Sequence, residues 1–353
     1  MTQLLPATPS AISQAAQLLR DGQIVAFPTE TVYGLGADAL RPEAVLRIFA
    51  AKGRPADNPL IVHVAEIANV EPLVARIDAP ARLLMERCWP GPLTLVLPKA
   101  ARVPSQVTAG LDTVAVRFPA HPVALALIRE AAKPIAAPSA NRSGRPSPTL
   151  AGHVYADMNG RIPLILDGGA CSVGVESTVL DVTGPTPVVL RPGGVTPEAL
   201  RALLGEVRVD AAALAPLGED AAPRSPGMKY KHYAPDAAVM VVSGEQTARI
   251  KLACQRYDSA VAAGERAVVL APAENQRAYG GRVFRALGRT GYPGEVAAQL
   301  FAALRELDAQ GFQRVIAEEI EAEGMGLAVM NRLYRAASFC VEHAGEAQGI
   351  IEN

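Results

Sequence analysis

Hydrophobic and polar positions alternate between a helical and a strand period along the first two hundred residues. After Pro9, apolar residues recur at helical spacing until Gly22, and a short apolar strand over 24–27 follows. The same reasoning predicts further helices over 42–52, 67–76, 79–88, 122–132 and 197–204. It predicts further strands over 60–64, 93–97, 114–118, 163–166, 178–182 and 188–191. This alternation indicates an α/β domain over residues 1–204.

The pattern breaks over residues 205–236, which are rich in Ala, Pro and Gly and end in SPGMKYKHYAP. A linker that only connects two domains would not need that density of aromatic, His and Lys residues. Alternation then resumes with predicted strands over 238–242, 267–270 and 314–317, and helices over 247–263, 294–310 and 327–337. Residues 237–353 are therefore expected to form a smaller three-layer α/β domain.

The composition is typical of a cytoplasmic enzyme. Half of the residues are hydrophobic, a fifth are charged, and the net charge is −1. Charges are nearly balanced in both halves, which argues against strong binding to nucleic acid. The four cysteines form no C-x-x-C pair, so neither a zinc site nor a disulfide framework is indicated. The N-terminus lacks the features of a signal peptide, and no apolar run is long enough to span a membrane.

Two polar segments suit a bound polyphosphate. KGRPADNPL begins at Lys52, and SANRSGRPS begins at Ser139. Arginine offers a rigid fork of donors to phosphate oxygens and lysine a compact charge, but no Walker loop is present. Lys52 and Arg54 could instead only oppose a helix dipole, and the serines could only cap turns.

Buried polar positions raise a second question. Arg117 lies in the middle of an apolar strand, where an unpaired charge would be costly, so it must meet a protein carboxylate or a ligand carboxylate. Arg191 poses the same choice, with phosphate as the ligand. His63 also lies in an apolar strand, where a hydrogen-bonded core histidine is common. Ser177 has no base at catalytic-triad spacing, which argues against a serine hydrolase.

The segment PTETVYGLG follows a buried strand and fits either a hydroxyl-capped turn or a loop around a small polar ligand. Together with KGRPADNPL, SANRSGRPS and GVESTV, in that order, it resembles the Sua5/YrdC/YwlC family, the threonylcarbamoyl-AMP synthases. SPGMKYKHYAP and GYPGEVAAQLF resemble the two-domain Sua5 form. The resemblance implies a YrdC-like twisted mixed-sheet α/β domain with a central ligand cavity over 1–204. It also implies a linker or lid over 205–236 that reaches the active site, and a Rossmann-like Sua5 domain over 237–353.

The resemblance further implies synthesis of L-threonylcarbamoyladenylate from L-threonine, bicarbonate or CO2, and ATP, with release of pyrophosphate. This is the first step of N6-threonylcarbamoyladenosine formation in tRNAs that read codons beginning with A. The product would pass to a tRNA threonylcarbamoyl transferase machinery. Mg²⁺ would be held by the ATP phosphates and water, with no protein ligands.

The site residues follow from the resemblance, position by position. ATP contacts are implied for Lys52, Arg54, Asn58, Thr113, Ser139, Asn141, Ser147, Arg191 and Tyr233. Threonine contacts are implied for Thr31, His63, Arg117 and Ser177. Lys52, Arg54 and Arg117 are expected to be catalytic. We expect Arg117 to clamp the threonine carboxylate, and Lys52 and Arg54 to offset charge on the phosphates.

Alternatives remain open at this level. An RNA-binding module is disfavoured by the balanced charge, which also argues against stable direct tRNA binding. A hydrogenase-maturation type of carbamoyl enzyme is disfavoured because zinc-finger cysteines and an acylphosphatase-like segment are missing. The C-terminal domain could retain a labile intermediate through the linker, or it could only stabilise the first domain.

Overall fold

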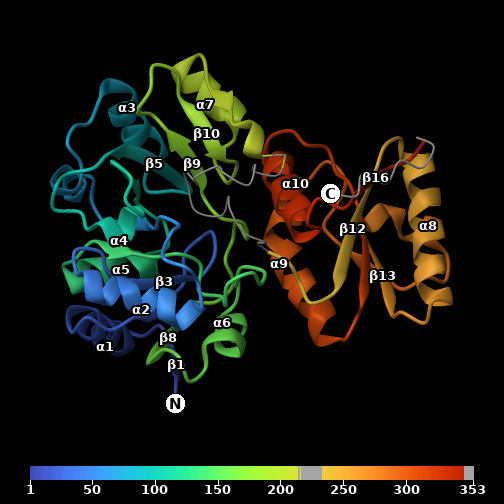
Figure 1. The fold of residues 1–353 in the computed structure, drawn as a ribbon, viewed down its shortest axis with the longest axis horizontal. Helices are drawn as coiled ribbons and strands as arrows, with labels where there is room; N and C mark the ends of the chain where they lie inside the picture. Colours follow the sequence, from blue (N-terminus) through green and yellow to red (C-terminus); the bar gives the residue numbers. More distant parts are fainter. Residues whose placement is uncertain (214, 216–232, 346–353) are drawn as a thin grey trace. The chain divides into compact units, whose positions relative to one another are not determined.

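The computed structural model describes residues 1–213, 215 and 233–345. The chain divides into two compact units, shown in Figure 1. The described part of the first unit comprises residues 1–143 and 147–213, and the second comprises 144–146, 215 and 233–345. We describe each unit by itself.

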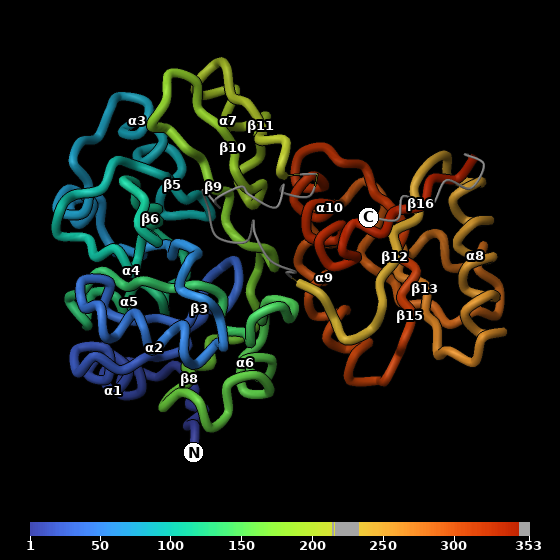
Figure 2. Tube along the Cα trace, in the orientation of Figure 1, coloured from blue at the N-terminus to red at the C-terminus, as the bar shows by residue number. Residues whose placement is uncertain are grey.

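The described strands of the first unit form one mixed sheet of 11 strands. Their order is β1-β8-β2-β3-β7-β4-β6-β5-β9-β10-β11. The strands are β1 Gln3–Pro6, β2 Val25–Phe27, β3 Gly34–Asp38, β4 Ile61–His63, β5 Leu93–Pro98, β6 Thr113–Arg117, β7 Ile135–Ala136, β8 Leu164–Asp167, β9 Thr178–Asp181, β10 Val188–Arg191 and β11 Arg208–Val209. The N-terminal strand pairs in parallel with β8, far along the sequence (Figure 2).

Helices cover both faces of this sheet. They are α1 Pro9–Arg20, α2 Pro42–Lys52, α3 Ala79–Cys88, α4 Ser105–Thr108, α5 Pro122–Ala131, α6 Ala151–Met158 and α7 Pro197–Leu204. Along β2, Val25 and Phe27 join a core with α1 and α5, while Ala26 joins a second core with α2 and α3. Because neighbouring residues of a strand point to opposite faces, the two cores lie on opposite sides of the sheet.

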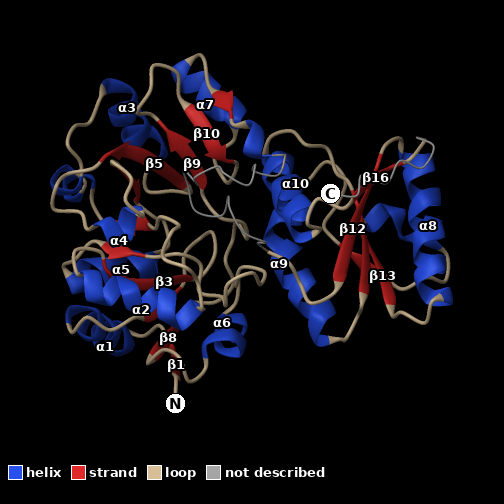
Figure 3. Cartoon of the chain, in the orientation of Figure 1, coloured by secondary structure: helices blue, strands red, loops and turns tan. Residues whose placement is uncertain are grey.

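The second unit has three layers around a fully parallel sheet of order β14-β13-β15-β12-β16. The strands are β12 Ala238–Ser243, β13 Ala267–Ala271, β14 Phe284–Ala286, β15 Arg314–Glu318 and β16 Val341–His343. The helices are α8 Gln246–Ala262, α9 Pro293–Ala309 and α10 Met325–Ala336, with a 3-10 segment η4 Ala273–Tyr279. As Figure 3 shows, α8 covers one face and α9 and α10 the other. The α/β prediction is thus confirmed.

One predicted helix is wrong. Residues 67–76 form two 3-10 turns, η1 Ile67–Asn69 and η2 Glu71–Leu73, instead of an α-helix. Pro72 has no N–H to donate within such a helix, and the chain leaves η2 in an extended conformation at Val74. A helix was expected because apolar residues happen to recur there at helical spacing.

Several elements were missed by the sequence analysis. Strand β3 begins at Gly34, inside PTETVYGLG, and continues to Asp38, where no strand was predicted. Helix α6 and strands β1, β7, β11, β14 and β16 were also not predicted. At Gly36 in β3, an added Cβ would lie 2.7 Å from Ile135 Cγ2 and 2.8 Å from Phe27 Cε1. That position therefore needs glycine because neighbouring side chains occupy the space.

Within residues 1–213, 215 and 233–345, no helix is both long and apolar enough to cross a membrane.

Candidate active site

Strands β4, β5 and β6 place three polar side chains in one row of the first unit. His63 is the register partner of Arg117, and Arg117 is the partner of Thr94 on β5. Register partners point to the same face of a sheet, and all three residues are buried. This row forms the polar centre of the site.

The Arg117 guanidinium is bound on three sides by the protein. Its Nη2 donates to Glu30 Oε1 at 2.5 Å, its Nη1 to the Thr31 hydroxyl at 2.8 Å, and its Nε to the Gly91 carbonyl at 3.3 Å. The anion that this buried charge required is therefore a protein carboxylate. A two-pronged clamp on a ligand carboxylate would have to displace Glu30 from Nη2.

Glu30 is only half satisfied by this pairing. Burial alone would raise the pKa of its carboxyl. The charge and hydrogen bond of Arg117, aided by the backbone N–H groups of Glu30 and Ala120, outweigh burial and lower the pKa below 4.5. Glu30 Oε2 is buried and has no hydrogen-bond partner among the described residues. A buried carboxylate oxygen without a donor is costly, so it marks a place where a ligand donor fits.

The loop before β3 holds Glu30 and Thr31 in place. The Thr29 hydroxyl donates to the Val32 carbonyl at 2.6 Å, accepts from the backbone N–H groups of Thr31 and Val32, and lies 2.8 Å from the Thr31 hydroxyl. The segment is therefore a hydroxyl-capped turn, and the same turn presents Thr31 to Arg117.

His63 carries a second unpaired atom in this region. Burial and the nearby Arg117 charge lower the pKa of its imidazole to about 3, so the ring is neutral at physiological pH. Its Nδ1 is buried without a partner in the described part of the chain. The ring packs edge-on against Phe27, with centroids 6.2 Å apart.

Lys52 joins the helix end to the serine-asparagine loop. It is the last residue of α2, and only 4% of its surface is exposed. Its Nζ donates to the carbonyls of Ser139 at 2.5 Å and Asn141 at 2.7 Å. The Ser139 hydroxyl donates to Asn141 Oδ1 at 2.5 Å. Lys52 is therefore a buried, fixed cation beside this loop, more than a charge that opposes a helix dipole.

Asn58 lies in the loop between α2 and β4. It is fully buried, and neither its amide nitrogen nor its amide oxygen has a partner among the described residues. Arg54 lies in the same loop, just after the left-handed C-cap at Gly53, and Thr113 begins β6; both are half-buried.

A second hydroxyl cluster forms around β9 and β10. The Ser177 hydroxyl lies 2.8 Å from the Thr94 hydroxyl and accepts from Arg191 Nη2 at 3.2 Å. Arg191 Nε also donates to the Ser177 carbonyl at 3.1 Å. The Ser147 hydroxyl is hydrogen-bonded to Glu176. Ser177 thus links Arg191 to the row on β4, β5 and β6.

Tyr233 belongs to the second unit. It is buried, with a positive φ of 65°, and its ring lies 5.2 Å from that of Phe301, with the Arg332 guanidinium 5.6 Å away. Contact with a nucleotide stays a prediction. The remaining aromatic and basic residues of the expected lid, 229–232, lie outside the described residues.

The structure thus gathers Thr31, His63, Arg117, Ser177 and Arg191 around the row on β4, β5 and β6, and joins Lys52, Ser139 and Asn141 by hydrogen bonds. Sequence reasoning missed Glu30 and Glu176. Each stands next to a predicted site residue, and the need of Arg117 for an anion was the available signal for Glu30. Among the described residues, no group of three or more His, Cys, Asp or Glu side chains is arranged to hold a metal ion.

Two parts of the chain match known protein families. Residues 17–193 match the Sua5_yciO_yrdC family, described as "Telomere recombination". Residues 195–338 match the family "Threonylcarbamoyl-AMP synthase, C-terminal domain".

Similar proteins extend over nearly the whole chain. The threonylcarbamoyl-AMP synthase of Bacillus subtilis is 50% identical over 327 residues, 92% of each chain. That of Pyrococcus abyssi is 49% identical over 325 residues, 92% of this chain and 93% of that protein. The crystal structure of P. abyssi Sua5 complexed with L-threonine has a TM-score of 0.90 and 47% identity, and covers 97% of this chain and 98% of that one.

Proposed function

The chain belongs to the family of two-domain Sua5-type threonylcarbamoyl-AMP synthases, and we propose that it makes L-threonylcarbamoyladenylate from L-threonine, bicarbonate and ATP. Similarity over 92% of the chain to a synthase of that name carries this proposal. The buried polar network of the first unit supports it, because a small polar ligand would satisfy its unpaired atoms.

Threonine would occupy the row around His63 and Arg117. The Glu30 carboxylate, anchored by Arg117, offers Oε2 to a donor, and His63 offers Nδ1 beside it. Thr31 and Ser177 supply hydroxyls to the same network. An ammonium or hydroxyl group of threonine provides the donor that Glu30 lacks. P. abyssi Sua5, whose fold this chain shares, was solved with L-threonine bound.

The nucleotide would lie against the cluster of Lys52, Ser139 and Asn141. The unpaired amide of Asn58 can both donate to and accept from a ligand. Arg54, Thr113, Ser147, Arg191 and Tyr233 complete the proposed ATP contacts. Mg²⁺ would be held by the triphosphate and water.

The chemistry has two steps. The neutral amine of threonine attacks CO2 to form an N-carboxylate and release a proton, or it attacks bicarbonate to form the same N-carboxylate and one water. An oxygen of this new carboxylate then attacks the α-phosphorus of ATP, and pyrophosphate leaves. Lys52 and Arg54 would offset the charge that moves to the leaving group, while the buried row orients the amino acid. The product would enter N6-threonylcarbamoyladenosine formation on tRNA.

Pyrophosphate release from ATP tests the proposal directly. We expect release by the purified chain only when L-threonine and bicarbonate are both present with Mg²⁺. A mass spectrum of the product should show an adenylate heavier than AMP by a threonylcarbamoyl group. The proposal is contradicted if pyrophosphate is released equally well without threonine, or if the folded protein releases no pyrophosphate.

A further inference from the structure

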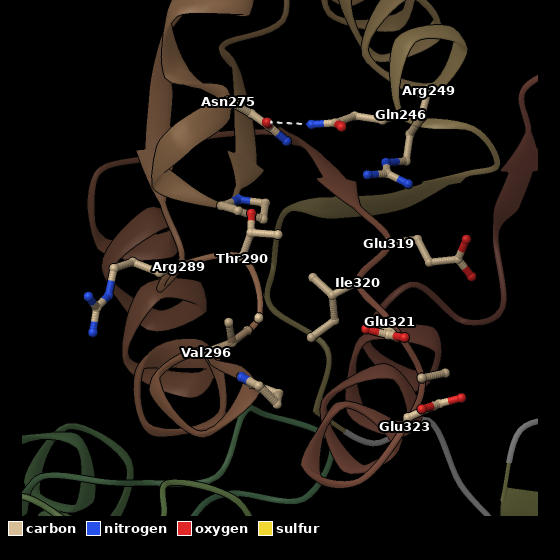
Figure 4. Close-up of a pocket in the computed structure, with 14 residues that line it drawn as sticks. Gln246, Arg249, Asn275, Arg289, Thr290, Val296, Glu319, Ile320, Glu321 and Glu323 are labelled. Carbon is tan, nitrogen blue, oxygen red and sulfur yellow. Dashed lines mark hydrogen bonds between the residues drawn. The ribbon is translucent and has the colours of Figure 1, made fainter.

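A cavity of about 620 Å³ lies in the second unit, at the carboxyl edge of its parallel sheet (Figure 4). Loops that follow β12, β13, β14 and β15 line it. Strands β12 and β15 are neighbours, but the helix after β12 covers one face and the helix after β15 covers the other. Such a switch point opens the crevice in which open α/β sheets bind ligands.

Arg249 and Asn275 line the cavity and form what we call its polar floor. Glu318, buried at the end of β15, accepts from Arg249 Nε at 3.0 Å, Asn275 Nδ2 at 3.0 Å and the Tyr279 hydroxyl at 2.7 Å. Arg249 Nη1 also donates to the Gly244 carbonyl at 2.8 Å. Since these bonds fix Arg249 and Asn275, the floor is already organised before any ligand arrives.

Two polar atoms on lining side chains remain available. Asn275 Oδ1 accepts from Gln246 Nε2 at 3.0 Å, which orients the Gln246 amide. Arg249 Nη2 and Gln246 Oε1 have no hydrogen-bond partner in residues 233–345 or elsewhere in the described chain. Both residues lie on α8, three positions apart, so their side chains share one face of the helix. Figure 4 draws both among the residues that line the cavity. They offer a fixed donor beside a fixed acceptor, which suits the edge of a heteroaromatic base.

The charges of the lining disfavour an anion. Arg249 is paired with Glu318, and Arg289 with Glu295. The lining also includes three carboxylates that have no cationic partner within the described residues: Glu319, Glu321 and Glu323, which we call the rim carboxylates. A phosphate would meet surplus negative charge here, whereas sugar hydroxyls can donate to carboxylates.

The walls between floor and rim are apolar, formed by Pro272, Val296 and Ile320. The volume is in the range of small-molecule sites, about 300–1,000 Å³. We propose that this cavity binds an uncharged nucleoside. The base lies against the apolar walls and is read by Arg249 and Gln246, and the ribose hydroxyls donate to the rim carboxylates. This site is additional to the proposed synthase site, because it is built only from second-unit residues.

Calorimetric titration of the full chain with adenosine, guanosine, cytidine and uridine tests the inference. Ile320→Trp fills the cavity, and Glu321→Gln, at an exposed position, removes one rim charge without touching the core. We expect at least one nucleoside to bind, about 10-fold or more weaker in Ile320→Trp and about 5-fold weaker in Glu321→Gln. The corresponding 5′-monophosphate should bind more weakly than the nucleoside.

Two controls separate this site from the nucleotide site of the first unit. Asn58→Ala and the exposed Glu86→Gln should leave nucleoside affinity unchanged. The inference is wrong if none of the four nucleosides binds at millimolar concentration, or if Asn58→Ala abolishes binding while Ile320→Trp and Glu321→Gln do not weaken it. It is also wrong if the monophosphate binds more tightly than the nucleoside at a site that Ile320→Trp weakens. A circular dichroism spectrum and a Tm of Ile320→Trp that match those of wild type show that this variant is folded. Its threonine-dependent pyrophosphate release reports on the first unit and tests the proposed function separately.

Discussion

Replacing Glu30 with glutamine isolates the charge that neutralises buried Arg117. The side chain of Arg117 is 4% exposed and that of Glu30 is 10% exposed, so solvent screens the pair little. Removing one partner of a buried pair costs about 3–5 kcal/mol. Because the glutamine oxygen can still accept from Arg117, we expect a loss near the low end, about 3 kcal/mol in unfolding free energy. For a domain of about 200 residues, this lowers Tm by about 6–12 °C.

The pH dependence distinguishes a lost charge from a packing defect. Arg117 lowers the pKa of the Glu30 carboxyl below 4.5 in the folded chain. The stabilisation is therefore complete above pH 4.5 and is lost as the pH falls through the lowered folded pKa. Thermal melts from pH 3 to pH 8 should show a constant gap in Tm between wild type and Glu30→Gln above pH 5. The gap should narrow below pH 4.5.

A surface pair provides the matched control for this measurement. Asp78→Asn breaks an ion pair with Arg76 whose side chains are 50% and 59% exposed. Exposed pairs contribute less than about 1 kcal/mol, so Tm should hardly change. The reasoning fails if Glu30→Gln shifts Tm no more than Asp78→Asn does, or if its Tm deficit is the same at pH 3.5 and pH 7. Threonine KM, measured in the same preparations, should rise only in Glu30→Gln.

Three further predictions follow from the first unit. Asn58→Ala should raise the KM for ATP about 10-fold in pyrophosphate release. It should change Tm by less than about 2 °C, because no described protein group loses a hydrogen bond. A large loss of Tm with an unchanged KM would contradict this prediction. His63→Gln should remove the loss of stability that wild type suffers as the pH falls from 6.5 to 3, since the pKa of buried His63 is lowered to about 3. Urea unfolding at pH 7 and pH 5 measures how the unfolding free energy changes with pH, and the same change in wild type and variant refutes the assignment. Gly193→Ala should cost more than about 3 kcal/mol in urea unfolding and abolish activity, because the new Cβ would lie 2.3 Å from Thr178 N, whereas Gly184→Ala, with its nearest atom 4.0 Å away, should be almost neutral.

Hydrophobic periodicity predicted the helices and strands that bury a continuous apolar face. It failed where contacts with distant parts of the chain decide the local structure. Strand β3 was missed because Gly34 and Gly36 read as loop residues, although Phe27 and Ile135 leave no room for a side chain at Gly36. That crowding comes from β2 and β7, so no local pattern contains it. The proximity of Lys52 to the Ser139 loop was expected from their chemistry, but the buried lysine bonds to backbone carbonyls could not be predicted.

Arg117 shows where sequence reasoning stops and what the structure then adds. Its place in an apolar strand required an anion, but Glu30 lies 87 residues away and no spacing rule joins them. Pairing leaves Glu30 Oε2 unpaired, next to a network that also holds the unpaired Nδ1 of His63. Each such buried atom costs about 1–3 kcal/mol until a ligand satisfies it. A ligand that carries a hydrogen-bond donor at that position therefore binds more tightly than a ligand that carries a methyl group there. The same polar groups that cost free energy while they are unpaired can thus select threonine over an apolar amino acid.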